Sequence, residues 1–131
     1  MQATGILCEL LTCFYYDFAD ASDHRHTRHR LIPAIEYIEQ HFDKPMTLEQ
    51  LAKLSNMSVT NFRREWAKQY TQAPMQYRDS LRLYYGKEYL LSGYYSVSEV
   101  ARKCGFEDVS YFVRFFKKRV GLTPGEFQKN I

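Results

Sequence analysis

The chain has 131 residues, of which 45% are hydrophobic and 25% are charged, with only six glycines and four prolines. This composition is typical of an ordinary folded domain and excludes a disordered tail and collagen-like or low-complexity material. Residues 1–23 hold four acids and no Lys or Arg, so the other 108 residues carry all 18 bases against 11 acids, a balance of +7. A basic block of this size favours a polyanionic partner.

Neither a membrane anchor nor a disulfide framework is predicted. The apolar-rich run of residues 6–18 is shorter than the roughly 20 residues that a membrane span needs, and no basic segment precedes it as in a signal peptide. Cys8 and Cys13 lie close together and Cys104 far away, which fits neither paired disulfides nor a zinc ribbon. We therefore expect a soluble, cytoplasmic protein with no membrane contact, and a buried structural role for Cys104.

Residues 1–22 are predicted to form an amphipathic helix. Apolar side chains recur there at spacings of four, three and four residues, at Leu7, Leu11, Phe14 and Phe18. Such a seam either pairs with its copy in a second chain, giving a homodimer, or folds back on the basic part of the chain. Four turns are too few to decide between the two.

Residues 23–30 are predicted to be a polar linker. They contain an aspartate and three histidines, residue types that bind zinc, but the spacing places the histidines on no single helical face. These residues are Asp23, His24, His26 and His29. We predict no metal and no cofactor, and we expect a helix over residues 31–42 with Pro33 in its first turn.

The next hundred residues contain an internal repeat. The segment 47–77 aligns with 96–127 at an offset of 49, which becomes 50 after the extra residue Glu107. Each copy begins with Thr or Ser followed three residues later by Gln or Glu, the pattern of a capping box. Each then has a residue that tolerates a left-handed turn (Asn56, Gly105) and a second cap (Ser58, Asp108). The repeat predicts two helix-turn-helix units, at residues 31–78 and 93–131.

The second helix of each unit has two faces when its residues are placed at 100° intervals. Apolar side chains form one face and predict the core: Val59, Phe62, Trp66 and Tyr70, then Val109, Phe112, Phe116 and Val120. The outward face carries Thr60, Arg63, Arg64 and Ala67, then Ser110, Val113, Arg114 and Lys117. Arginine can donate two hydrogen bonds to guanine, and small apolar groups can touch a thymine methyl. A solvated surface would explain any one residue, but two such faces in register favour a nucleic-acid partner.

Residues 79–92 are predicted to form a helix that links the units. About 14 residues of helix span roughly 20 Å, which would place the two outward faces about one DNA turn, roughly 34 Å, apart. Gly86 in mid-helix costs about 1 kcal/mol against alanine, and close packing against the first unit is the expected reason. Four tyrosines have no assigned role, although a protein-contact surface would use them: Tyr84, Tyr85, Tyr94 and Tyr95.

Several short motifs add a family resemblance. They include residues 47–52 (TLEQLA), 105–106 (GF), 110–114 (SYFVR), 116–118 (FKK) and 121–124 (GLTP). Because of these motifs, residues 31–131 resemble the DNA-binding domain of the AraC/XylS family of bacterial transcription regulators. The resemblance implies an all-α domain of seven helices, with two homeodomain-like helix-turn-helix subdomains joined by a long helix. It also implies an activator that binds promoter DNA beside RNA polymerase.

The same resemblance bears on the rest of the protein. Residues 1–22 resemble the last helix of the family's N-terminal sensory and dimerisation domain, so we expect the sequence to be a fragment of a longer regulator. An effector, if there is one, would bind the domain that is absent here.

The family's base-reading positions fall on outward residues of both units. In the first unit they are Thr60, Arg63 and Arg64; in the second they are Val109, Ser110, Val113 and Arg114. Arg63 is the leading candidate for a specific base contact, whereas Arg64 and Arg114 could instead hold phosphates. Further phosphate candidates are Ser58, Asn61, Lys68, Lys117 and Lys118. The chain departs from the family pattern at Gly86, where alanine is preferred, at Tyr84-Tyr85, and at Val113, which weakens the expected readout by the second unit.

No enzymatic motif is present: the sequence has no Gly-rich phosphate loop, no G-x-S-x-G elbow and no suitably spaced Cys–His pair. We therefore expect a sequence-specific regulator that binds double-stranded DNA, and not an enzyme. Two alternatives stay open. One is a helical module that recruits polymerase or another regulator, and the other is a binder of RNA or single strands that stacks bases on its aromatic side chains.

Overall fold

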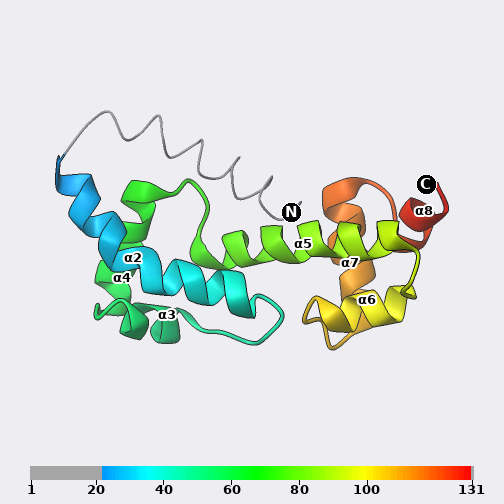
Figure 1. The fold of residues 1–131 in the computed structure, drawn as a ribbon, viewed down its shortest axis with the longest axis horizontal. Helices are drawn as coiled ribbons and strands as arrows, with labels where there is room; N and C mark the ends of the chain where they lie inside the picture. Colours follow the sequence, from blue (N-terminus) through cyan, green and yellow to red (C-terminus); the bar gives the residue numbers. More distant parts are fainter. Residues whose placement is uncertain (1–21, 131) are drawn as a thin grey trace. The chain divides into compact units, whose positions relative to one another are not determined.

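The computed structural model describes residues 22–130, and these form seven α-helices and no strand (Figure 1). The helices are α2 (Ser22–His41), α3 (Leu48–Leu54), α4 (Val59–Gln69), α5 (Pro74–Ser92), α6 (Val97–Lys103), α7 (Val109–Val120) and α8 (Pro124–Lys129). The all-α prediction is confirmed. Among these helices, none combines the length and the hydropathy needed to cross a membrane. The predictions for residues 1–21, including the apolar seam and its pairing, lie outside the described residues.

The described residues divide into two compact units, each with one helix-turn-helix. The first unit contains α2, α3, α4 and the start of α5 as far as Asp79. The second contains α5 from Ser80 onward, α6, α7 and α8, together with the loop 42–45 that follows α2 in the chain. The helices α3–α4 and α6–α7 are therefore the two copies that the internal repeat predicts.

The core of the first unit forms where apolar stripes of its helices meet. Figure 1 shows α2 alongside α3 and α4. The fully or almost fully buried side chains are Leu31, Ala34 and Ile38 of α2, Leu51 and Ala52 of α3, Phe62 and Trp66 of α4, and Tyr77 of α5. On α2 they are spaced by three and four residues, so they lie on one stripe. The small side chain of Ala52 is buried at the α3–α4 crossing, as the sequence indicates.

The core of the second unit is built largely of phenylalanines. Its buried members are Leu90, Val100, Ala101, Cys104, Phe106, Phe112, Phe115 and Phe116. The predicted burial of Cys104 is confirmed, because its side chain has no exposed surface. Phe115 was not among the predicted core residues, although it lies one position before Phe116 on the buried side of α7.

The predicted caps are present with one difference. Thr47 Oγ1 accepts from the Gln50 N–H (3.2 Å) and Gln50 Oε1 accepts from the Thr47 N–H (3.0 Å), a complete capping box. Ser96 Oγ likewise accepts from the Glu99 N–H (3.2 Å). However, Glu99 Oε1 accepts from the Ser96 hydroxyl (3.1 Å) and not from the backbone N–H. The second box is therefore half formed, because a hydroxyl can donate to a carboxylate while it accepts from an amide.

The turns between the paired helices adopt the predicted left-handed backbone. The φ angle is +54° at Asn56 and +93° at Gly105. A β-carbon added to Gly105 would lie 2.5 Å from the Asp43 carbonyl oxygen. Asn56 tolerates this conformation because its short polar side chain costs little there, whereas Gly105 also avoids a steric clash.

Two helix boundaries differ from the sequence-based prediction. Helix α2 begins at Ser22, so the predicted polar linker 23–30 is helical and Pro33 lies in the helix interior rather than in its first turn. The polar sequence did not reveal where α2 begins, because a helix can continue through residues that stay in solvent. His29 and Arg30 are such residues: they are helical and exposed. Helix α5 begins at Pro74 rather than residue 79, because proline is pre-organised for a first helical position.

Gly86 lies in a different environment from the one expected. It is buried in the second unit, and a β-carbon placed there would lie 3.6 Å from the Phe112 ring and 3.7 Å from Cys104 Sγ. The expected packing against the first unit is therefore wrong. Both distances are ordinary van der Waals contacts, so the site has room for a methyl group, and nothing in the structure requires glycine.

Three of the four unassigned tyrosines pack within the second unit. Tyr85 stacks on Phe42 with ring centroids 4.7 Å apart, and Tyr84 lies edge-on to Tyr85. Tyr95 lies edge-on to Tyr89, and the Lys103 ammonium is 4.6 Å from its ring centroid. Only Tyr94 projects into solvent, with 86% of its surface exposed.

Candidate nucleic-acid interface

Helix α4 presents the outward face that the helical wheel predicts. The Ser58 hydroxyl accepts from the Asn61 N–H at 3.2 Å and fixes the start of the helix. Phe62 and Trp66 are buried beneath it. The four outward side chains, Thr60, Arg63, Arg64 and Ala67, are all exposed. The apolar side of α4 thus anchors the helix and leaves the opposite side open to a partner.

The cations of α4 differ in their polar partners. Arg64 Nη2 donates to Asn61 Oδ1 at 3.0 Å, and Lys68 pairs with Glu65 at 3.2 Å. Within the described part of the chain, Arg63 makes no hydrogen bond or ion pair. Its guanidinium is free to donate to an incoming acceptor without first breaking an internal bond. The exposed Lys68–Glu65 pair is weak, because exposed pairs contribute about 0.2–1 kcal/mol.

Helix α7 repeats this arrangement with more basic residues. Asp108 Oδ1 accepts from the Ser110 N–H at 3.0 Å and begins the helix. The exposed side chains are those of Ser110, Arg114, Lys117 and Lys118. Arg114, like Arg63, has no polar partner among the described residues. Helices α4 and α7 therefore each offer one exposed arginine without a polar partner among the described residues.

The two valines among the predicted base-reading residues are less open than the polar ones. Val109 and Val113 are half-buried, and Val109 packs against the core of the second unit. A side chain that serves the core offers only part of its surface to a partner. The residue Arg119, which the sequence did not single out, lies over the Phe115 ring, with its guanidinium carbon 3.9 Å from the centroid.

Charge at the helix starts differs between the two units. Neither α4 nor α7 carries an acidic residue in its first turn. The backbone N–H groups there carry a partial positive charge that favours an anion. The cap of α4 is the neutral Ser58, whereas the cap of α7 is the carboxylate of Asp108, which offsets part of that charge.

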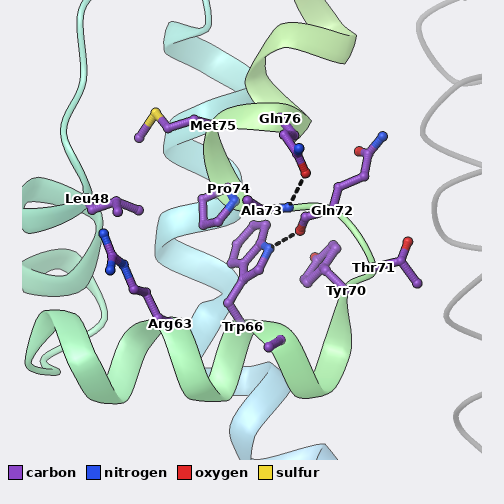
Figure 2. Close-up of a pocket in the computed structure, with 11 residues that line it drawn as sticks. Leu48, Arg63, Trp66, Tyr70, Thr71, Gln72, Ala73, Pro74, Met75 and Gln76 are labelled. Atoms are coloured by element: carbon purple, nitrogen blue, oxygen red, sulfur yellow. Dashed lines mark hydrogen bonds between the residues drawn. The ribbon is translucent and has the colours of Figure 1, made fainter.

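A pocket of about 460 Å³ opens beside the outward face of α4 (Figure 2). Its walls come from α4, from the loop that follows it and from the first residues of α5, with Leu48 of α3 at one side. Figure 2 shows the Trp66 indole at the centre, with Nε1–H donating to the Gln72 carbonyl oxygen at 2.7 Å. The sequence pattern did not reveal this pocket, because residues 70–73 lie in a loop that has no periodicity.

No metal site is formed by the described residues: no three His, Cys, Asp or Glu side chains come together there. Of the three histidines considered from the sequence, only His29 has a described side chain, and it is exposed. The side chains of His24 and His26 lie outside the described part.

The sequence matches known helix-turn-helix proteins. Residues 51–130 match the family model described as "Helix-turn-helix domain". The chain is 31% identical over 91 residues to YpdC of Escherichia coli K12, an uncharacterized HTH-type transcriptional regulator, covering 70% of this chain and 32% of YpdC. It is 30% identical over 94 residues to the bifunctional transcriptional activator/DNA repair enzyme AdaA of Bacillus subtilis, covering 72% of this chain and 44% of AdaA. The chain therefore spans less than half the length of these relatives.

The structure also matches a solved protein–DNA complex. The DNA-binding domain of the global transcriptional factor AdpA, determined in complex with a target DNA, superposes with a TM-score of 0.71 at 26% sequence identity. The match covers 76% of this chain and 90% of the AdpA chain. The fold is therefore one whose two helix-turn-helix motifs occur together in a DNA-binding domain.

Proposed function

Because the chain belongs to the AraC/XylS family of helix-turn-helix transcription regulators, we propose that it binds promoter DNA sequence-specifically and regulates transcription, as an activator. Helices α4 and α7 enter successive major grooves on one side of the duplex. The observation that carries the proposal is the pair of repeated helices, each with a buried aromatic face and an exposed arginine that has no polar partner among the described residues. The structure of the AdpA domain with its target DNA supports DNA binding by the two helix-turn-helix motifs.

Each exposed group has a chemical role in this proposal. Arg63 donates both guanidinium arms to O6 and N7 of a guanine, and Arg114 reads or clamps the DNA in the second unit. The other proposed contacts to base edges come from Thr60, Arg64, Val109, Ser110 and Val113. Phosphate contacts come from Ser58, Asn61, Lys68, Lys117 and Lys118, which position the protein without reading sequence.

The proposal also includes partners other than DNA: RNA polymerase, an effector and a second copy of the chain. They are suggested by the family and by residues 1–22, and not by the described residues. RNA polymerase is the expected partner of an activator bound at a promoter, and an effector would bind a domain outside this chain. Homodimerisation through residues 1–22 stays part of the proposal, as does action in the cytoplasm, where bacterial promoters lie. The match to AdaA comprises its helix-turn-helix region, so the DNA-repair activity of AdaA is not carried over to this protein.

The decisive experiment selects binding sites from a randomised duplex library and then tests Arg63→Ala on the selected site. We expect two half-sites about 10 base pairs apart. The substitution should cost about 1–3 kcal/mol in binding and relax the preference at one base pair, because a bidentate contact to guanine is lost. Lys68→Ala is the control: it removes one positive charge from a proposed phosphate contact on the same helix and should weaken binding more evenly across sequences.

The same experiment tests the alternatives. Equal or tighter binding to unstructured oligonucleotides would favour a single-strand or RNA binder. No duplex preference at all, with capture of a protein partner retained, would favour an interaction module. Unchanged operator binding by Arg63→Ala would contradict the assignment of Arg63 as a base-reading residue.

A further inference from the structure

The pocket beside α4 is mainly apolar and has one charge at its edge. Apolar atoms form most of its walls, and the lining residues include Leu48, Trp66, Ala67, Pro74 and Met75. Among the described residues, Arg63 is the only charged one that lines the pocket, and no carboxylate lines it. Figure 2 shows the Arg63 side chain rising from α4 along the pocket toward Leu48, beside Trp66 and Pro74. Since Arg63 has no polar partner among the described residues, its charge is available to the pocket.

We propose that this pocket binds a small organic anion, a compact apolar body that carries one carboxylate. The volume of about 460 Å³ lies in the range of small-molecule sites, which are typically apolar with a few placed polar groups. The apolar body contacts the pocket walls, and the carboxylate accepts from the Arg63 guanidinium in a charge-assisted hydrogen bond. A neutral ligand of the same shape could accept only an ordinary hydrogen bond from Arg63, and a cationic one would be repelled.

The second unit lacks the equivalent chemistry. At the repeat offset of 50 residues, Arg63 aligns with Val113, Ala67 with Lys117 and Met75 with Gly125. The arginine is therefore replaced by an apolar residue, and part of the apolar wall by a cation and a glycine. Anion binding should be a property of the first unit alone.

Occupation of the pocket would change DNA binding. This consequence rests on the proposed function, in which Arg63 reads a base. A carboxylate that holds the guanidinium occupies the donors that guanine would use, so the ligand and the operator compete. Binding of the anion to the free protein does not depend on that function and can be measured without DNA.

The chain provides its own reporter for this site. Trp66 is the only tryptophan in the sequence and lies in the pocket wall. Emission excited at 295 nm therefore reports this site alone. The probes are adamantane-1-carboxylate and its neutral isostere adamantane-1-carboxamide, neither of which absorbs at that wavelength. We expect a saturable change in Trp66 emission, with the carboxylate bound about fivefold tighter than the amide, the upper limit for an ion pair open to solvent.

Matched variants separate the pocket from the rest of the surface. Arg63→Gln should bind the two probes equally, whereas Arg64→Gln, which removes a neighbouring charge outside the pocket lining, should keep the preference for the carboxylate. Ala67→Phe should fill the pocket and abolish both responses, and Thr60→Phe, on the same helix face but outside the pocket, should not. Thermal unfolding followed by circular dichroism verifies that each variant is folded.

Three results would overturn the proposal: no saturable emission change, equal affinity for carboxylate and amide in the unmodified protein, or an undiminished response in folded Ala67→Phe. A gel shift with the selected operator then tests competition. Loss of DNA binding on addition of the carboxylate, with a smaller loss on addition of the amide at the same concentration, is expected. If the protein binds the carboxylate but no duplex, the proposed function fails while the anion site stands.

Discussion

At the scale of single residues, the described glycines of the second unit occupy contrasting environments. Gly105 and Gly121 both have positive φ angles, of +93° and +92°. A β-carbon on Gly105 would collide with the Asp43 backbone, whereas one on Gly121 would meet nothing within 4 Å. Both positions strain an L-residue, but only Gly105 also lacks space. The turn between α6 and α7 therefore depends on this glycine for two separate reasons.

Gly105→Ala should destabilise the protein by at least about 2 kcal/mol, since left-handed strain adds to a backbone clash. Gly121→Ala is the matched control and should cost about 1 kcal/mol, because only the strain applies. Urea unfolding followed by circular dichroism measures both free energies. Equal losses in the two variants would show that the Asp43 backbone moves aside at no cost.

Cys104 illustrates how burial controls reactivity. Burial raises the pKa of its thiol to about 12, with the nearby Asp43 carboxylate also raising it and the Arg82 and Lys103 cations opposing the change. Cysteine reacts as the thiolate. The buried thiol is therefore a packing group that stays protonated throughout the physiological pH range.

We expect Cys104 to resist a thiol reagent in the native protein at pH 8. A pKa of about 12 instead of 9 leaves about a thousandfold less thiolate at this pH. The measurement uses 5,5′-dithiobis(2-nitrobenzoate) on a Cys8→Ser, Cys13→Ser background, so that only one thiol remains. Rapid labelling should appear in urea. Labelling at the unfolded rate without urea would contradict the buried, protonated state.

At the scale of the helices, the N-cap residues both begin a helix and set its local charge. The caps Ser58 and Asp108 begin α4 and α7 by the same kind of side-chain hydrogen bond to a backbone N–H. Serine, aspartate and asparagine are comparably good caps, but only aspartate brings a negative charge. The first unit thus keeps an uncompensated positive helix end beside its outward face, and the second does not.

Ser58→Asp should therefore leave stability nearly unchanged while weakening DNA binding about threefold to tenfold, because a carboxylate at the start of α4 repels a phosphate. Ser58→Asn is the control that keeps the cap without the charge. Thermal unfolding and operator titrations at fixed salt give the two quantities. If Ser58→Asp binds the operator as tightly as Ser58→Asn, no phosphate approaches this helix end.

A buried arginine determines how the loop after α2 is held. Arg82 Nε donates to the Phe42 carbonyl oxygen at 2.7 Å, and its guanidinium carbon lies 5.1 Å from the centroid of the Phe106 ring. The Phe42 ring also stacks on the ring of Tyr85, which lies on α5 together with Arg82. These contacts explain why residues 42–45 belong to the second unit although α2 belongs to the first.

At the scale of the whole molecule, the two units share the continuous helix α5. We therefore expect that they do not bind DNA independently of each other. Both units carry outward-facing cations on the helices assigned to the grooves. The affinity of a protein that engages two half-sites should depend on the spacing between them. It should also fall as the salt concentration rises, since every phosphate contact releases counterions.

Insertion of five base pairs between the half-sites should reduce affinity to about that of a single half-site, because half a helical turn moves the second site to the opposite side of the duplex. A site whose second half is randomised at the original spacing is the control that gives the affinity for a single half-site. Titrations at several salt concentrations should give a shallower salt dependence for the five-base-pair variant, as fewer phosphates are contacted. Equal affinity for the original and the five-base-pair spacing would show that only one unit reads DNA.

The sequence by itself determined the parts that depend on local chemistry. The capping pattern at Thr47, the left-handed positions Asn56 and Gly105, and the buried faces of α4 and α7 follow from neighbouring residues and helical periodicity. The outward position of Arg63 followed in the same way. The repeat made these local signals reliable, because each appears twice in register.

Tertiary structure alone decided the features that depend on contacts between distant residues. The neighbours of Gly86, the capture of the loop 42–45 by Arg82 and the pocket beside Trp66 all join segments that no helical period relates. The start of α2 at Ser22 also escaped prediction, because polar residues that need not be buried carry no periodic signal. Local propensity fixes which face a helix buries, but only packing fixes what that face meets.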